Sequence, residues 1–297
     1  MLKTEMTARI KADGFIAALD QSGGSTPNAL RHYGIPEDSF EDEAQMFSLM
    51  HAMRVRIISS PAFTGASIIG AILFEGTMNG LVNNRPVPSY LWEERAVVPF
   101  LKVDKGLEAE THGVNLMKPI PNLDSVLERA TKLGVYGTKM RSLINFPDQK
   151  GIATLVNQQF ATAATIAAHG LMPIVEPEIS IESPYKQAAE EILLAELTAT
   201  LDAMTEDSQV ILKLTLPDVQ NFYAPLIDHP RVVRVVALSG GFSRAEACRR
   251  LAKQRGIIAS FSRALTEELR VFMEEDDFCS TLSKSVEQIY SASVHKT

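Results

Sequence analysis

Eight short apolar runs, separated by longer helical patterns, predict an α/β fold in which the strands close into a single (β/α)8 TIM barrel. The runs are rich in β-branched residues and nearly continuous in hydrophobicity, as is typical of strands buried on both faces. Strands that alternate with helices are expected to be parallel, with right-handed crossovers. We expect one domain over residues 1–297, which is enough chain for one such barrel.

The expected elements follow one another along the whole chain. We place strands at residues 14–20, 66–74, 97–103, 135–144, 172–179, 210–215, 232–239 and 257–263. We place helices at residues 40–58, 123–132, 152–169, 184–204, 243–254 and 264–274, with a weaker one at 218–227 and a closing one at 282–291. Residues 79–94 are expected to form a long loop. A doubly wound open sheet is the main alternative, but DQSGGS after the first strand is not its glycine fingerprint.

Composition and charge restrict the classes of partner. A net charge of −7 disfavours nucleic acid, whose partners carry a basic surface. No run approaches the roughly 20 apolar residues of a membrane helix, and the N-terminus lacks a secretory signal. Cys248 and Cys279 lie far apart, outside any C-x-x-C motif, which indicates a reducing compartment. We therefore expect a cytoplasmic protein that binds neither nucleic acid nor membrane.

The histidines argue against a catalytic metal. All six are scattered, and none forms H-x-x-H, H-E-x-x-H or a pair at a strand end. A catalytic zinc site needs clustered protein ligands, most often histidines. We therefore expect neither a metal nor another cofactor.

Polar side chains fall at the carboxyl ends of the predicted strands, where barrel enzymes gather their chemistry. They include Asp20, Lys102, Asp104, Lys139, Arg141, Glu176, Glu178, Lys213, Ser239, Ser262 and Arg263. A single lysine at a strand end is usually a solvated surface group. However, Lys139 and Arg141, like Glu176 and Glu178, are two residues apart and share one strand face. An outward face would press these charges against the helices, so we expect them to point into the barrel mouth and form a functional site.

The chain resembles the class I fructose-1,6-bisphosphate aldolases, specifically a short bacterial-type member. The motifs that carry the resemblance run in order from Gly14 to Arg263: ALDQSGGS, LKVDKG, TKMR, IVEPE, ILK, LSGG and SFSRAL. These enzymes are metal-independent and act through a lysine Schiff base. The resemblance implies reversible cleavage of fructose 1,6-bisphosphate to dihydroxyacetone phosphate and glyceraldehyde 3-phosphate, in glycolysis and gluconeogenesis. It implies a small phosphosugar as the partner, and we expect a homo-oligomer.

The resemblance also implies roles for individual residues. Lys213 forms the imine with the ketose, Glu176 is the general acid and base, and Glu178 orients Lys213. Asp20 takes the proton of the C4 hydroxyl, and Lys139 polarises the oxygens of the intermediate. The phosphate far from the carbonyl is assigned to Ser22, Ser25, Lys102 and Arg141. The phosphate near the carbonyl is assigned to Ser239, Gly240 and Arg263.

The sequence independently favours Lys213 over its rivals as the nucleophile. Lys213 lies within the apolar strand VILKLT, where desolvation favours the free amine that imine formation needs. Glu176 and Glu178 lie on the preceding strand, which is its neighbour in a barrel. Lys139 is the main rival, but it shares its strand face with the cationic Arg141.

Two other functions remain open from the sequence. One is another lysine-imine barrel enzyme, such as a transaldolase or a deoxyribose-phosphate aldolase, for which two phosphate sites would be excessive. The other is a phosphosugar-binding barrel without activity. It is disfavoured because Asp20, Lys139, Glu176 and Lys213 are all present.

Overall fold

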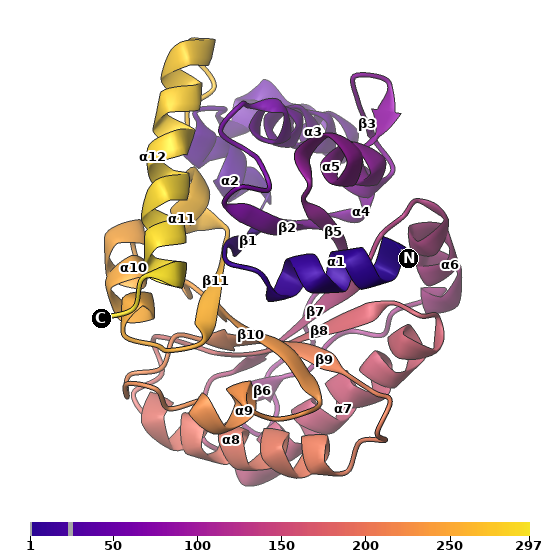
Figure 1. Ribbon diagram of the computed structural model, residues 1–297, viewed down its shortest axis with the longest axis vertical. Helices are drawn as coiled ribbons and strands as arrows, with labels where there is room; N and C mark the ends of the chain where they lie inside the picture. Colours follow the sequence, from indigo (N-terminus) through magenta and orange to yellow (C-terminus); the bar gives the residue numbers. More distant parts are fainter. Residues whose placement is uncertain (1, 23–25) are drawn as a thin grey trace.

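The computed structural model describes residues 2–22 and 26–297. Within them, eight parallel strands close into a barrel, as predicted (Figure 1). Hydrogen-bonded neighbours follow the order β5-β2-β1-β11-β10-β9-β8-β7, and β5 pairs with β7 to complete the ring. The barrel strands are β1 (Phe15–Leu19), β2 (Ile68–Leu73), β5 (Val98–Lys102), β7 (Gly137–Ile144), β8 (Met172–Ile179), β9 (Val210–Thr215), β10 (Val232–Leu238) and β11 (Ile257–Phe261).

Helices surround this barrel in the predicted places (Figure 1). The long ones are α3 (Glu43–Ser59), α6 (Leu123–Lys132), α7 (Gln149–Ala168), α8 (Lys186–Asp202), α10 (Arg244–Ala252) and α12 (Glu275–Val294). Side-chain caps define several starts: Asp42 accepts from the backbone N–H of Gln45 at α3, and Asp148 accepts from Gly151 at α7. The weaker helix predicted at 218–227 is reduced to α9 (Ala224–Ile227).

The helix predicted at residues 264–274 is wrong. Only α11 (Arg263–Thr266) is helical. The guanidinium of Arg270 donates to the carbonyls of Glu267 and Leu269, and the N–H of Val271 donates to the Tyr33 carbonyl. These contacts use backbone groups that a continuing helix would pair internally.

The loop predicted at residues 79–94 is also wrong. A hairpin of β3 (Leu81–Val82) and β4 (Arg85–Pro86) is followed by α5 (Val87–Arg95). Asn83 and Asn84 adopt positive φ values of 50° and 62°, which a two-residue hairpin turn requires and asparagine tolerates. Pro88 lies in the first turn of α5, where proline costs no helical hydrogen bond. The turn and proline signals were therefore present in the sequence.

Five further elements of the described chain were not predicted from the sequence. They are α1 (Leu2–Lys11), α2 (Thr26–Tyr33), η2 (Glu37–Ser39), α4 (Glu75–Met78) and β6 (Val114–Asn115), which pairs antiparallel with β7.

Helix α1 covers the amino-terminal end of the barrel (Figure 1). Its Met6 and Ile10 belong to the apolar cluster inside the barrel, together with Phe100 of β5. Thr7 shares a 2.9 Å hydrogen bond with Tyr136, just before β7. This end of the barrel is thus filled by apolar contacts. In the part of the chain that is described, no helix is long and apolar enough to cross a membrane.

Candidate active site

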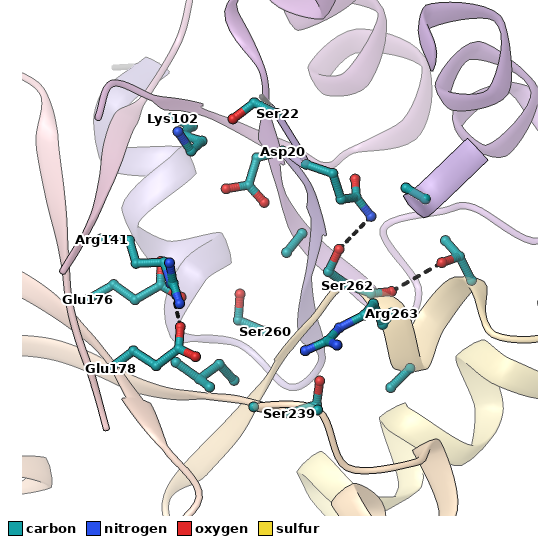
Figure 2. Close-up of a pocket in the computed structure, with 18 of the residues that line it drawn as sticks. Asp20, Ser22, Lys102, Arg141, Glu176, Glu178, Ser239, Ser260, Ser262 and Arg263 are labelled. Atoms are coloured by element: carbon teal, nitrogen blue, oxygen red, sulfur yellow. Dashed lines mark hydrogen bonds and ion pairs between the residues drawn. The ribbon is translucent and has the colours of Figure 1, made fainter. Parts of the chain in front are cut away.

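A cavity of about 780 Å³ opens at the carboxyl end of the barrel strands. Within the described ranges, every expected site residue lines it, and Figure 2 labels many of them. Those residues are Asp20, Ser22, Lys102, Lys139, Arg141, Glu176, Glu178, Lys213, Ser239, Gly240 and Arg263. Ser25 lies outside the described residues. The prediction that strand-end charges face one mouth is therefore confirmed for the residues that can be placed.

Four charged side chains form a continuous series at the floor of this cavity. Glu176 Oε1 lies 2.9 Å from Lys213 Nζ, and its Oε2 lies 2.9 Å from Lys139 Nζ. Lys139 Nζ in turn lies 2.7 Å from Asp20 Oδ2. Strand register explains the contacts, because Ile174 and Val175 of β8 pair with Ile211 and Leu212 of β9. Glu176 and Lys213 are the next residues on these neighbouring strands.

The charges of this series stabilise one another in a buried place. Burial alone would raise the pKa of Asp20, but Lys139 and Lys213 hold it well below its usual value. The pKa of Glu176 is lowered by the same two lysines against the effect of burial. Burial would lower the pKa of Lys139, but Asp20 and Glu176 raise it above its usual value. Lys139 is therefore a fixed cation between two carboxylates, not a free amine.

The surroundings of the two lysines differ in a way that bears on nucleophilicity. Among the described residues, Lys139 Nζ has three carboxylates within 4.0 Å, from Asp20, Asp104 and Glu176. Lys213 Nζ has one, from Glu176. Lys213 Nζ thus has fewer anionic neighbours than Lys139 Nζ, which carboxylates hold protonated from three sides.

On one side of the cavity, two cations are already paired with carboxylates. Lys102 Nζ lies 2.7 Å from Asp104 Oδ1, and Arg141 Nε contacts Glu178. Burial alone would lower the pKa of Arg141, but Glu178 raises it above its usual value. The ion pair of Glu178 is therefore with Arg141, whereas the carboxylate beside Lys213 is that of Glu176.

The other side of the cavity contains Arg263 and Ser239 (Figure 2). No carboxylate in the described part of the chain forms an ion pair with Arg263, the first residue of α11. Gly240 has a φ of 63°, and a Cβ there would lie 2.6 Å from Ile181 Cγ2. Glycine is therefore required in this turn after β10, which leaves backbone N–H groups accessible near a cation.

Comparison with known proteins identifies the family. The family model for class I fructose-bisphosphate aldolases matches residues 4–221. A fructose-bisphosphate aldolase class 1 from Porphyromonas gingivalis is 52% identical over 294 residues, which is 99% of this chain and 100% of the relative. Its counterpart from Clostridium acetobutylicum is 50% identical with the same coverage. The chain belongs to the class I fructose-bisphosphate aldolase family. It is an enzyme of the lyase class, and the resemblance stated from its motifs is confirmed.

Solved structures independently show the fold of this aldolase. A fructose-bisphosphate aldolase from Plasmodium falciparum superposes with a TM-score of 0.79 at 21% identity, covering 99% of this chain and 95% of that one. An archaeal fructose 1,6-bisphosphate aldolase gives a TM-score of 0.55 at 11% identity, covering 98% and 100%. At these identities the likeness supports the barrel and its strand order.

The sequence reasoning missed a serine in the aldolase site. Ser260 is 1% exposed, lines the cavity, and its hydroxyl has no hydrogen-bond partner among the described residues (Figure 2). It lies on β11, two residues before Ser262. The spacing argument used for Lys139 and Arg141 would therefore have found it.

A buried arginine behind the site was also missed. Arg54 of α3 is 1% exposed, yet in the sequence it looks like an ordinary charged position of a surface helix. No pattern along the chain distinguishes it, because its partners come from other elements.

Metal-ligating side chains do not cluster in this protein as far as it is described. Over those residues, no group of three or more His, Cys, Asp or Glu side chains could hold a metal ion. Cys248 and Cys279 are both free thiols.

Proposed function

We propose that this aldolase cleaves fructose 1,6-bisphosphate reversibly through a Schiff base on Lys213, without a metal. The observation that carries the assignment is the buried series Lys213–Glu176–Lys139–Asp20. It provides one amine that can lose its proton, one carboxylate in contact with it, and a second carboxylate held ionised by a fixed cation. These are the groups that imine formation and carbon–carbon cleavage need.

In the first stage, Lys213 Nζ gives a proton to Glu176 and attacks the C2 carbonyl of the ketose. A second proton passes from the attacking nitrogen to the carbinolamine oxygen. Glu176 then returns the first proton to this hydroxyl, which leaves as water. At 2.9 Å, Glu176 is within direct proton-transfer distance of Lys213. Lys139 stabilises the oxygen of the carbinolamine and keeps Glu176 ionised between transfers.

In the second stage, Asp20 removes the proton from the C4 hydroxyl. The C3–C4 bond breaks, its electron pair moves into the protonated imine to give an enamine, and glyceraldehyde 3-phosphate leaves as the aldehyde. Lys139 keeps Asp20 in its basic, ionised form. Protonation of C3 and hydrolysis of the imine then release dihydroxyacetone phosphate and restore Lys213.

The two phosphates are proposed to bind at opposite sides of the cavity. Arg263, with Ser239 and the N–H of Gly240, binds the phosphate near the carbonyl. Lys102, Arg141 and Ser22 bind the far one, to which the motif also assigns Ser25, outside the described residues. Because Lys102 and Arg141 already face Asp104 and Glu178, the far phosphate meets partly neutralised cations. For Glu178 we therefore propose that it orients Arg141 for the phosphate, in place of the role toward Lys213 expected from the sequence.

We also propose that residues 1–297 work as one domain, in the cytoplasm and as a homo-oligomer. The two free thiols support a reducing compartment. Sedimentation equilibrium of the purified chain tests the oligomeric state, and a mass equal to one chain would contradict it.

Borohydride trapping tests the proposed function. Reduction in the presence of dihydroxyacetone phosphate should add a three-carbon label to the peptide that contains Lys213. Lys213→Ala should abolish the label, whereas Lys139→Ala should slow turnover and still allow some labelling. A label on Lys139, or trapping that survives Lys213→Ala, overturns the assignment. A panel of ketose phosphates and deoxyribose 5-phosphate separates this activity from those of other lysine-imine barrels.

A further inference from the structure

Arg54 is a charged side chain with an unusual place in this fold. It projects from α3, on the outside of the barrel, and is 1% exposed. Its Nη2 donates to the backbone carbonyl of Gln21, and its Nη1 donates to Thr77 Oγ1 at 2.9 Å. Burial lowers its pKa to about 10, so it remains a cation at neutral pH, and Asp20 is the acid whose charge favours the protonated form.

The two contacts of Arg54 fix the chain where it leaves two neighbouring strands. Gln21 directly follows Asp20 at the end of β1. Thr77 lies in α4, which follows β2. The planar guanidinium offers two donors at a fixed angle, so it holds both segments in one geometry. The backbone after Asp20 is thereby tied to helix α3.

The hydrogen bonds of Arg54 to Gln21 and Thr77 form a clamp, and a contact of Gln21 extends this clamp across the cavity mouth. The side-chain amide of Gln21 donates to Ser262 Oγ at 2.6 Å, the contact marked at Ser262 in Figure 2. Ser262 is the residue immediately before Arg263. Arg54 thus acts, through Gln21, on the segments that carry Asp20 and Arg263.

A purely structural role explains this arginine poorly. Burying a charge is costly, and apolar side chains of similar volume often replace buried charges with no loss of stability. No carboxylate hydrogen-bonds to Arg54 among the described residues, so its charge is not offset by a direct ion pair. Its hydrogen bonds instead reach the backbone beside Asp20, and its charge favours the ionised form of that acid.

We propose that Arg54 is a positioning residue for carbon–carbon bond cleavage, because it holds Asp20 in the orientation that faces Lys139. The inference rests on the proposed function, in which Asp20 takes the C4 proton. Without the clamp, the carboxylate of Asp20 can turn away from the 2.7 Å contact with Lys139. Imine formation uses Lys213 and Glu176, which Arg54 does not contact. Its loss should therefore slow cleavage and leave imine formation intact.

The test compares these two half-reactions in the same variants. Arg54→Met keeps a similar side-chain volume and removes the charge. Arg54→Lys keeps the charge but lacks the planar guanidinium with its two donors. For Arg54→Met, kcat for fructose 1,6-bisphosphate should fall about 100-fold, the effect of a misplacement near 1 Å, while KM stays close to wild type. For Arg54→Lys, the fall should be about 10-fold. In both, borohydride trapping with dihydroxyacetone phosphate should proceed at the wild-type rate.

Arg234 provides the matched control. It is partly buried, whereas Arg54 is fully buried. Like that of Arg54, its pKa is lowered by burial, and it donates to a backbone carbonyl, that of Lys11 at 3.1 Å. It lies on β10 at the end of the barrel that α1 covers, so Arg234→Met should keep kcat. Guanidinium ion added to Arg54→Ala should restore part of kcat and should have no such effect on Arg234→Ala.

The outcomes separate the inference from the proposed function. If wild-type protein does not trap dihydroxyacetone phosphate, the proposed function fails. If wild type traps and Arg54→Met keeps its kcat, or if cleavage and trapping fall equally, the positioning role is overturned. If Arg54→Met does not fold, Arg54→Lys decides by the same comparison.

Discussion

Removing Arg263 should reveal which phosphate it binds. Arg263 has no carboxylate partner in the described structure, so a substrate phosphate receives its whole charge. A hydrogen bond to a charged group contributes about 1.5–3 kcal/mol. For Arg263→Ala we expect a loss of binding free energy at the upper end of this range, which corresponds to a loss of roughly 100-fold in kcat/KM for fructose 1,6-bisphosphate. Lys102 shares its charge with Asp104 at 2.7 Å, so Lys102→Ala should lie near the lower end, about 10-fold.

The assay pairs each variant with a substrate that lacks one phosphate. Fructose 1-phosphate keeps the phosphate near the carbonyl and lacks the far one. With it, Arg263→Ala should retain its full penalty relative to wild type, whereas the penalty of Lys102→Ala should disappear. Fructose 6-phosphate should give the reverse. If both variants respond identically to fructose 1-phosphate, the assignment of the two phosphates to opposite sides of the cavity is wrong.

Three further predictions concern the metal, the charge series and the phosphate turn. A divalent chelator should leave the initial rate unchanged, and activity lost in EDTA and restored by zinc would contradict the metal-free mechanism. Lys139 lowers the pKa of both Asp20 and Glu176, so Lys139→Met should raise those pKa values and shift the acid limb of the kcat/KM profile to higher pH. An unchanged limb would show that neither carboxylate controls it. Gly240→Ala should lower the free energy of unfolding by about 1–3 kcal/mol, because φ is 63° and the new Cβ would meet Ile181. Urea denaturation measures this, and wild-type stability would show that the turn can relax.

The barrel and most of its site could be predicted because their signals are local. Strands buried on both faces produce continuous apolar runs, so a lysine such as Lys213 within one is conspicuous. Such local signals do not reveal which side chains pair with one another between neighbouring strands. The partner of Glu178 depends on the register between β7 and β8, which pairs Leu143 with Glu178 and brings Arg141 within contact.

Contacts between distant parts of the chain account for the remaining errors. The helix predicted at 264–274 ends at Thr266, and beyond it Val271 donates to the Tyr33 carbonyl. The role proposed for Arg54 depends on the packing of α3 behind β1 and β2, because both of its hydrogen-bond acceptors belong to segments after those strands. Such features depend on tertiary packing, which overrides local preference.

The pairing of β1 with β11 has a consequence for the formation of the site during synthesis of the chain. Ile16 of the first barrel strand lies opposite Ser260 of the last. The contact between Gln21 and Ser262 across this seam joins residues 241 positions apart. Asp20 stands on one side of the seam and Arg263 on the other, so the complete cavity requires the last strand to pair with the first. A nascent chain that lacks β11 also lacks Arg263, and its cavity is therefore incomplete.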